Sequence, residues 1–179
     1  MDASLRAALV DVTRLFEDAG IPFQVGGSAL LHSLGLVDRV GDLDLVFRPE
    51  DRDRLGDTLR RATGTPPAFD IRQEPGFVSS WRAEHRFGDA DLDMTGGIAL
   101  GYPNGFVARL PFTPGSVWRL GDVAVPLAPL ADWLLVYRYH NPRRAALLEP
   151  HVPPAAWRAL LAAIDAPHGF DGTVPATPA

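Results

Sequence analysis

Val25-Gly26-Gly27-Ser28 and, after a spacer of 13 residues, Asp42-Leu43-Asp44-Leu45 are the stretches that decide the fold of this chain. The first follows a short β-prone run and leads into a helix that the pattern predicts over 29–36, with Ser28 as its N-cap. The second alternates aspartate with apolar residues, which predicts a strand over 43–47. Residues two apart in a strand share a face, so the two carboxylates point the same way.

Two carboxylates on one face of a strand repel each other unless a cation lies between them. Mg²⁺ suits Asp42 and Asp44 because it takes carboxylate oxygens together with the phosphates of a substrate. The alternative is a solvated strand edge, or a pair neutralised by Arg39 or Arg48. Upstream, Gly26 and Gly27 would let a phosphate approach the backbone at the start of the next helix.

The chain holds other closely spaced aspartates, and their context separates them. Asp51 and Asp53 fall in the first turn of a predicted helix, where acidic side chains complement the helix dipole. Asp91 and Asp93 alternate with apolar residues in a predicted strand over 90–94. If that strand lies beside 43–47, one of them completes a three-carboxylate cluster able to hold two metal ions about 4 Å apart. Asp93 is the preferred member, but Asp91 has the same parity, and the choice stays open.

Composition narrows the possible chemistry. The 179 residues carry 17 basic and 22 acidic side chains, a formal charge of −5, so extended binding of nucleic acid is not expected. All the basic residues are arginine, and the chain has no lysine and no cysteine. This excludes disulfides, thiolate zinc sites, cysteine nucleophiles and lysine Schiff bases. No membrane span or signal peptide is apparent, so a cytoplasmic protein is expected.

The order of predicted elements indicates an α/β (α+β) fold, with a small mixed β-sheet, flanking helices and a C-terminal helical section. We expect the core over 1–126, the helical section packed on it over 127–165, and a disordered tail over 166–179. The predicted elements alternate between helices and strands in the first half and end in helices: helix 3–19, strand 21–25, helix 29–36, strand 43–47, helix 51–62, strands 68–72, 77–87, 90–94 and 106–110, hairpin 118–125, and helices from 127, 143–148 and 154–164.

These residues resemble the nucleotidyltransferase superfamily typified by DNA polymerase β and the minimal nucleotidyltransferases. Its signature is a hydrophobic residue and Gly-Gly-Ser, a spacer of about a dozen residues, an Asp-x-Asp strand, and a later strand carboxylate. The match covers about the first 95 residues and ends with Leu92-Asp93-Met94. Val125-Pro126-Leu127 and the helix after it also resemble the bacterial stand-alone members.

The resemblance implies transfer of a nucleoside monophosphate from a nucleoside triphosphate to a hydroxyl. Gly26, Gly27 and Ser28 would cradle the phosphates, and Asp42 and Asp44 would hold Mg²⁺. Asp93, or Asp91 in its place, would hold a second ion and help to deprotonate the acceptor. The acceptor would be a small molecule, a protein side chain or an RNA end.

The sequence also departs from the family pattern. Arg39-Val40-Gly41-Asp42 is one residue shorter than the usual segment and lacks its hydroxyl residue. Arg138 stands where the family often has a lysine, so it becomes the expected phosphate ligand, with Arg143 and Arg144 as further candidates. Near them, Tyr137, Tyr139 and His140 would line an acceptor or base pocket, or belong to the core.

These departures keep a second interpretation open. It is an inactive nucleotidyltransferase-like domain that binds a nucleotide or a partner protein, for example in a toxin–antitoxin pair. A third, a glycosyltransferase that uses Asp-x-Asp with Mn²⁺, conflicts with the length of the chain, because such enzymes need separate nucleotide and acceptor halves.

Overall fold

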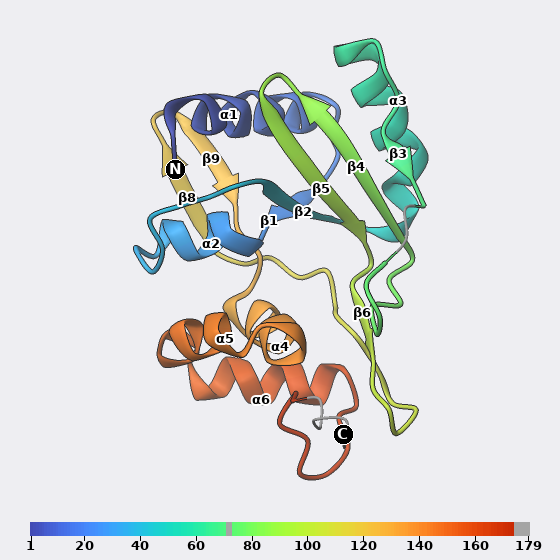
Figure 1. Ribbon diagram of the computed structural model, residues 1–179, viewed down its shortest axis with the longest axis vertical. Helices are drawn as coiled ribbons and strands as arrows, with labels where there is room; N and C mark the ends of the chain where they lie inside the picture. The colour runs from blue at the N-terminus through green and yellow to red at the C-terminus, as the bar shows by residue number, and fades with distance from the viewer. Residues whose placement is uncertain (71–72, 174–179) are drawn as a thin grey trace.

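The computed structural model describes residues 1–70 and 73–173 (Figure 1). Within these residues the main sheet has five strands in the spatial order β1-β2-β5-β4-β3. Their bounds, in the same order, are Phe23–Val25, Leu43–Phe47, Ala90–Gly96, Trp81–Phe87 and Ala68–Phe69. β2 and β5 run parallel, and the other neighbours are antiparallel. The predicted α+β class with a small mixed sheet is therefore confirmed.

The helices lie at the two ends of this sheet. Figure 1 shows α1 and α3 in the upper half of the molecule, with α4, α5 and α6 gathered below. Their bounds and those of the short 3₁₀ turns are α1 Ala3–Asp18, α2 Gly27–Ser33, η1 Pro49–Asp51, α3 Arg52–Thr63, α4 Leu130–His140, α5 Pro142–Leu148, η2 Glu149–His151 and α6 Pro154–Ala163. The apolar side chains of α1 recur at helical spacing and are buried, and the Asp2 carboxylate caps the helix by accepting from the Leu5 N–H at 2.8 Å.

Two small hairpins complete the fold. β8 (Val117–Leu120) pairs with β9 (Val123–Pro126), which confirms the hairpin expected over 118–125. β7 (Val107–Arg109) falls within the strand expected over 106–110, but it pairs with β6 (Ala99–Gly101), which the sequence did not predict. The predicted strand over 68–72 is observed as the two residues of β3, and residues 71–72 lie outside the described residues.

The predicted strand over 77–87 begins only at Trp81. The preceding residues form a loop because the Gln73 side chain accepts from the Ser79 N–H at 3.0 Å and donates to the Ser79 carbonyl at 2.9 Å. Phe77 contributes only an isolated bridge to Leu100. This loop becomes one wall of the pocket described below.

The hydrophobic core runs without interruption from the sheet into the C-terminal helices. The Ala128 N–H donates to the Val25 carbonyl at 3.0 Å, which fixes the start of this section against β1. The core residues of α4 include Leu134 and Leu135. A boundary at 126/127 stays a prediction.

Residues 166–173 do not form the disordered tail that their composition suggested. The Phe170 ring packs edge-on against Tyr102 and Phe106, with centroids 4.9 and 5.1 Å apart. The Tyr102 hydroxyl donates to the Gly172 carbonyl at 3.1 Å. Aromatic burial thus outweighs the Pro- and Gly-rich composition here. Residues 174–179 lie outside the described residues.

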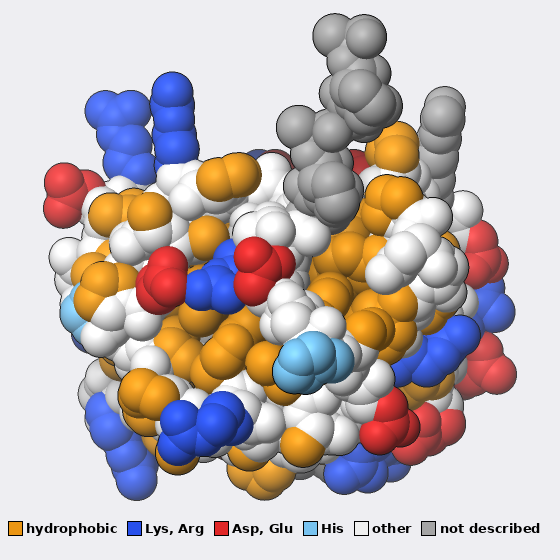
Figure 2. Space-filling view, turned by 90° about the horizontal axis from the view of Figure 1, so that it is seen from below, with side chains coloured by type: hydrophobic (Ala, Val, Ile, Leu, Met, Phe, Trp, Pro, Cys, Tyr) orange, Lys and Arg blue, Asp and Glu red, His pale blue; other side chains and the backbone are white. Residues whose placement is uncertain are grey.

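Figure 2 shows the lower face of the molecule, where basic and acidic side chains are interspersed with hydrophobic ones. Neither sign of charge gathers into one patch on this face, whereas nucleic-acid-binding surfaces concentrate arginine and lysine. Among the described residues, no helix has the length and apolar character needed to cross a membrane.

Candidate active site

Positions 26 and 27 both require glycine, because neighbouring groups leave no room for a side chain at either position. The Gly26 N–H donates to the Asp44 carbonyl at 2.9 Å, which joins the end of β1 to β2. A Cβ on Gly26 would lie 1.8 Å from the indole of Trp133. Gly27 has φ +54°, and a Cβ there would lie 1.6 Å from Oδ2 of Asp44. The turn therefore brings bare backbone against the Asp44 carboxyl group.

Ser28 has a different role from the predicted N-cap. Gly26 is the N-cap of α2, and Ser28 lies inside the helix. Its backbone N–H faces the Asp44 carboxylate and acts to lower the pKa of that group. Its hydroxyl is buried and has no hydrogen-bond partner among the described residues, so the group is left to bind another molecule.

The strand register brings the predicted carboxylates together. Asp44 on β2 lies directly beside Asp93 on the parallel strand β5, and Asp42 directly precedes β2. Desolvation raises the pKa of Asp44 to about 7, and the negative charges of Asp42 and Asp93 add to the rise. The Arg144 guanidinium and the Ser28 N–H act in the opposite direction. Asp44 is thus the carboxylate with the greatest need for a cation.

Asp93 and Asp91 pair with different arginines of β4, and this distinguishes their environments. Arg82 donates from Nε to Oδ1 of Asp93 at 3.0 Å and from a terminal nitrogen to Oδ2 at 2.6 Å. Arg86 holds Asp91 at 2.7 Å in an ion pair that is largely exposed. Asp93 lines the pocket beside Asp44, and Asp91 does not, although both border a shallower depression outside it.

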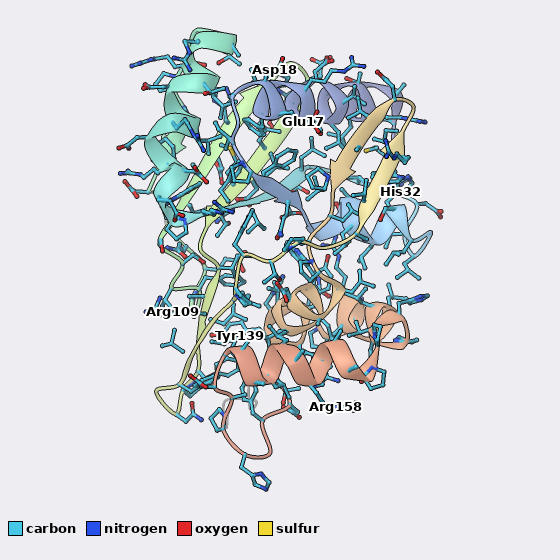
Figure 3. The ribbon with its side chains drawn as sticks, turned by 180° about the vertical axis from the view of Figure 1, so that it is seen from behind. Glu17, Asp18, His32, Arg109, Tyr139 and Arg158 are labelled. Atoms are coloured by element: carbon cyan, nitrogen blue, oxygen red, sulfur yellow. The ribbon has the colours of Figure 1, made fainter. Side chains whose placement is uncertain are left out.

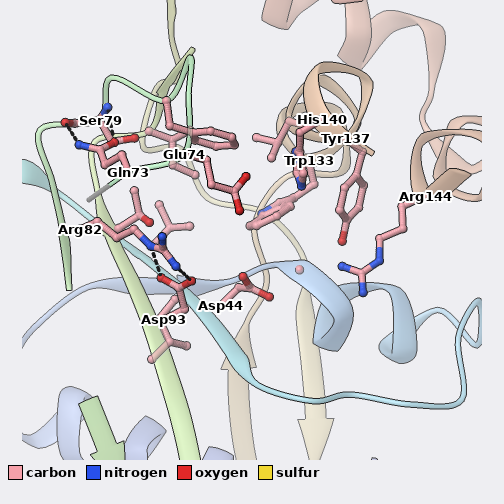
Figure 4. A pocket seen from close by; sticks show the side chains of 17 residues that line it. Asp44, Gln73, Glu74, Ser79, Arg82, Asp93, Trp133, Tyr137, His140 and Arg144 are labelled. Carbon is pink, nitrogen blue, oxygen red and sulfur yellow. Dashed lines mark hydrogen bonds and ion pairs between the residues drawn. The ribbon is translucent and has the colours of Figure 1, made fainter. Parts of the chain in front are cut away.

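Figure 4 shows the pocket above Asp44 and Asp93. Glu74 points into it from the 73–79 loop, while Tyr137 and Arg144 face it from α4 and α5 on the opposite side. The Tyr137 side chain is buried, and its hydroxyl has no hydrogen-bond partner among the described residues. Phe77, Trp133 and His140 add aromatic side chains to the lining, beside aliphatic ones such as Ile98 and Val136.

Arg138, the expected phosphate ligand, is not brought to this pocket. Its guanidinium donates to Glu149 at 2.6 Å and to the Asp171 carbonyl, and it lies over the Trp157 ring at 4.7 Å. Arg143 is exposed, whereas Arg144 lines the pocket. Figure 3 shows Tyr139 between the C-terminal helices and the β6 region, where its hydroxyl donates to the Gly101 carbonyl at 2.6 Å.

The residues present fit one hard divalent cation. Asp42 and Asp44 supply carboxylate oxygens, and the pKa of Asp44 is raised because the group is desolvated and lies near two other negative charges, which a bound cation would offset. No ion pair joins either of them to Arg39 or Arg48 in the part of the chain that the structure describes. Within the same residues, however, no group of three carboxylate or imidazole side chains is arranged to hold a metal ion. Asp93, the expected third carboxylate, instead accepts two hydrogen bonds from Arg82.

The sequence did not single out Arg82 or Glu74. The parity of β4 would have placed Arg82, Glu84 and Arg86 on one face, but it does not show that Arg82 reaches Asp93. The residue directly opposite Asp93 is Glu84, and Arg82 contacts Asp93 diagonally. Glu74 lies in a loop whose path depends on the Gln73–Ser79 hydrogen bonds, which carry no sequence signature.

Solved structures share this arrangement of elements. TM1012 of Thermotoga maritima, an inferred nucleotidyltransferase, matches with a TM-score of 0.60 and 13% identity over 88% of this chain and 92% of its own. The solution structure of the antibiotic-resistance factor ANT(2'')-Ia matches with a TM-score of 0.60 and 18% identity over 92% and 93%. The chain has the nucleotidyltransferase fold.

Two other structures with the nucleotidyltransferase fold were solved with bound molecules. ANT(2'')-Ia in complex with adenylyl-2''-tobramycin has a TM-score of 0.55 and 16% identity, over 89% of this chain and 96% of its own. The lincosamide antibiotic adenylyltransferase LnuA, with lincomycin bound, has a TM-score of 0.51 and 15% identity over 80% and 95%. No protein-family model matches the chain, and no curated protein matches it in sequence.

Proposed function

We propose that the protein is a Mg²⁺-dependent nucleotidyltransferase that acts in the cytoplasm and transfers a nucleoside monophosphate from its triphosphate to a hydroxyl of a small molecule. The carrying observation is the environment of Asp44. Its carboxyl group lies against the bare backbone of Gly27, beside Asp93, and within reach of the positive charge of Arg144. A metal-bound triphosphate supplies what this arrangement needs, a cation for the acids and phosphates for the arginine.

Each wall of the pocket has a role in this proposal. Asp42 and Asp44 would hold Mg²⁺, which when bound would neutralise charge on the triphosphate. Gly26, Gly27 and Ser28 would face the phosphates, the Ser28 hydroxyl gaining a partner. Arg144, in place of the expected Arg138, would bind the phosphate oxygens, because a guanidinium donates several hydrogen bonds to them.

The proposed reaction forms no covalent bond to the protein, so the side chains position the reacting groups and neutralise their charge. The acceptor oxygen attacks the α-phosphorus, the bond from that phosphorus to the bridging oxygen breaks, and pyrophosphate leaves. Asp93 takes the proton of the acceptor hydroxyl. The two hydrogen bonds from Arg82 keep the carboxylate in place, and its oxygens retain lone pairs for this proton.

The acceptor side of the pocket favours a small molecule with a positive charge. Glu74 supplies a carboxylate, and the aromatic walls of Phe77 and Trp133 supply faces over which a cation is stabilised. The net charge of −5 acts in the same direction. ANT(2'')-Ia with adenylyl-2''-tobramycin and LnuA with lincomycin show that this fold accommodates small antibiotic molecules.

The test is a thermal-shift titration of the four nucleoside triphosphates with and without Mg²⁺, on wild type and on Asp42→Asn/Asp44→Asn. A ligand that binds only the folded state raises Tm by mass action. We expect a rise that requires Mg²⁺ and disappears in the double variant. The nucleotide found in this way is then offered with an α-³²P label and a panel of hydroxyl acceptors, with and without amines.

The same titration separates the proposal from its alternative. The lack of three suitably arranged metal-ligating side chains among the described residues favours an inactive domain that binds a nucleotide or a partner protein. Nucleotide binding that is independent of Mg²⁺, unchanged in the double variant and without label transfer would establish that alternative. Absence of any shift would turn the search to a protein partner.

A further inference from the structure

Asp93 has both carboxylate oxygens occupied in the structure. Each accepts one hydrogen bond from Arg82, at 3.0 Å from Nε and at 2.6 Å from a terminal nitrogen (Figure 4). The side chains of Arg82 and Asp93 are only 24% and 25% exposed, so solvent screens the pair weakly. A two-pronged pair of this kind is among the strongest that side chains form.

The pair also lies where a second cation would have to bind. Arg82 borders both the main pocket and the depression that contains Asp42 and Asp91. An ion bound to Asp93 would therefore meet a guanidinium already in contact with the same carboxylate. The repulsion between the two positive charges opposes such an ion, while Asp42 and Asp44 carry no arginine partner among the described residues and stay open to one.

We propose that Arg82 is a positioning residue that takes the place of a second metal ion at Asp93, so that the protein binds a single divalent cation with its nucleotide. This rests on the proposed nucleotidyltransferase function. Arg82 supplies the fixed positive charge next to Asp93 and holds its carboxylate beside Asp44. One cation, at Asp42 and Asp44, is then sufficient.

Arg86 provides a matched control for Arg82. It lies on the same strand and also pairs with an aspartate of β5, at 2.7 Å, but its pair with Asp91 is exposed and lies outside the main pocket. Both arginines lose their charge and their ion pair with an aspartate of β5 when changed to glutamine. Only the Arg82 change uncovers a carboxylate of the pocket.

The experiment counts bound Mn²⁺ by electron paramagnetic resonance, with a non-hydrolysable nucleoside triphosphate analogue and a protein-free nucleotide blank. Wild type and Arg86→Gln are expected to bind one ion per chain, and Arg82→Gln two, because Asp93 then becomes available. Two ions in wild type would overturn the inference and leave the proposed function standing. One ion in a folded Arg82→Gln protein would overturn it as well.

Asp93→Asn keeps the inference testable if Arg82→Gln does not fold. It removes the carboxylate to which a second ion would bind, and we expect the count to stay at one. A count that falls below that of wild type would show that Asp93 is a metal ligand and overturn the inference. Lack of any nucleotide-dependent Mn²⁺ binding in wild type would instead overturn the proposed function, and the inference with it.

Discussion

Two arginine–aspartate pairs connect β4 to β5, and they differ both in their hydrogen bonds and in their exposure. Arg82 donates to both carboxylate oxygens of Asp93, whereas Arg86 donates to one oxygen of Asp91. Arg82 meets Asp93 at 2.6 Å, and Arg86 meets Asp91 at 2.7 Å. The side chains of the first pair are about a quarter exposed, whereas those of the second are 57% and 69% exposed. The first lines the pocket, and the second faces water. The same two residue types therefore form part of the site in one place and only of the surface in the other, and both the second hydrogen bond and the burial distinguish the inner pair.

The largest expected effect comes from the most desolvated carboxylate of the pocket. Asp44→Asn is expected to lower nucleotidyl transfer by about 10³-fold or more, because it removes a charge that holds the metal-bound substrate. Its Tm without metal should rise, since the variant no longer places a third negative charge beside Asp42 and Asp93. Label transfer and thermal unfolding in EDTA measure the two effects.

Asp91→Asn is the control for this change, because Asp91 belongs to the exposed ion pair with Arg86. Transfer by this variant should stay within about twofold of wild type. A similar loss in both variants would show that the pocket does not distinguish the inner carboxylates from the outer one.

Arg144 and Arg138 extend the comparison to the C-terminal helices. Arg144→Gln is expected to weaken nucleotide binding by about 10- to 100-fold, the loss of a hydrogen bond to a charged group. Arg138→Gln should leave binding unchanged and lower the free energy of unfolding by about 1 kcal/mol, because it loses Glu149 and the Trp157 ring. Nucleotide titration and denaturant unfolding of both variants measure these effects. If Arg138→Gln lost affinity and Arg144→Gln did not, Arg138 rather than Arg144 would be the phosphate ligand.

A smaller effect is expected from the pH dependence of Asp132, a buried carboxyl group in the first turn of α4. Burial raises its pKa to about 7. Between about pH 4 and pH 7 the folded state keeps a proton that the unfolded state releases, so this group makes stability fall as pH rises and adds no slope above that range. The Tm of Asp132→Asn relative to wild type should therefore be higher at pH 8 than at pH 4, by roughly 10 °C.

Asp53→Asn is the matched control, since Asp53 is an exposed acid in the first turn of α3. It should keep the wild-type profile of Tm against pH, and a wild-type profile in Asp132→Asn would contradict the effect assigned to Asp132. The slope that remains in Asp132→Asn combines the fall in stability from Asp44, whose pKa is also raised, with the opposite slopes of Asp171 and His85, whose pKa values are lowered.

The smallest effect is expected at the exposed pair itself. Arg86→Gln should leave Tm and nucleotide binding unchanged within error, because exposed ion pairs contribute little to stability. The thermal unfolding curves of this variant and wild type should coincide, and so should their nucleotide binding curves. A loss of affinity would mean that the outer pair belongs to the site after all.

Local patterns were sufficient to predict most of the fold. The alternation of aspartate and apolar residues at 42–45 predicted β2, and the glycines predicted the turn before α2. The parity of Asp91 and Asp93 predicted that they share a face, but parity cannot distinguish residues two apart. That distinction needs the lateral register of β5 on β2, which places Asp93 beside Asp44.

The rest of the site depends on contacts between distant segments. Arg138 and Arg144 both lie in the predicted C-terminal section, and only the packing of α4 on α6 shows that Arg138 faces Trp157 rather than the pocket. The docking of Phe170 on Tyr102 likewise follows from a contact between distant segments that overrides local preference. The path of the 73–79 loop depends instead on hydrogen bonds between its own two ends.

The contact between Gly27 and Asp44 also limits the order in which this sequence can evolve. Any side chain at position 27 would overlap the carboxyl group of position 44, so the glycine cannot be replaced while the aspartate remains. Loss of the acid would relieve only part of this overlap, because the Cβ of residue 44 would still lie 2.8 Å from a Cβ at position 27 and the positive φ there disfavours a side chain. A larger residue at position 27 would therefore require both the loss of the acid and a different backbone path through the turn.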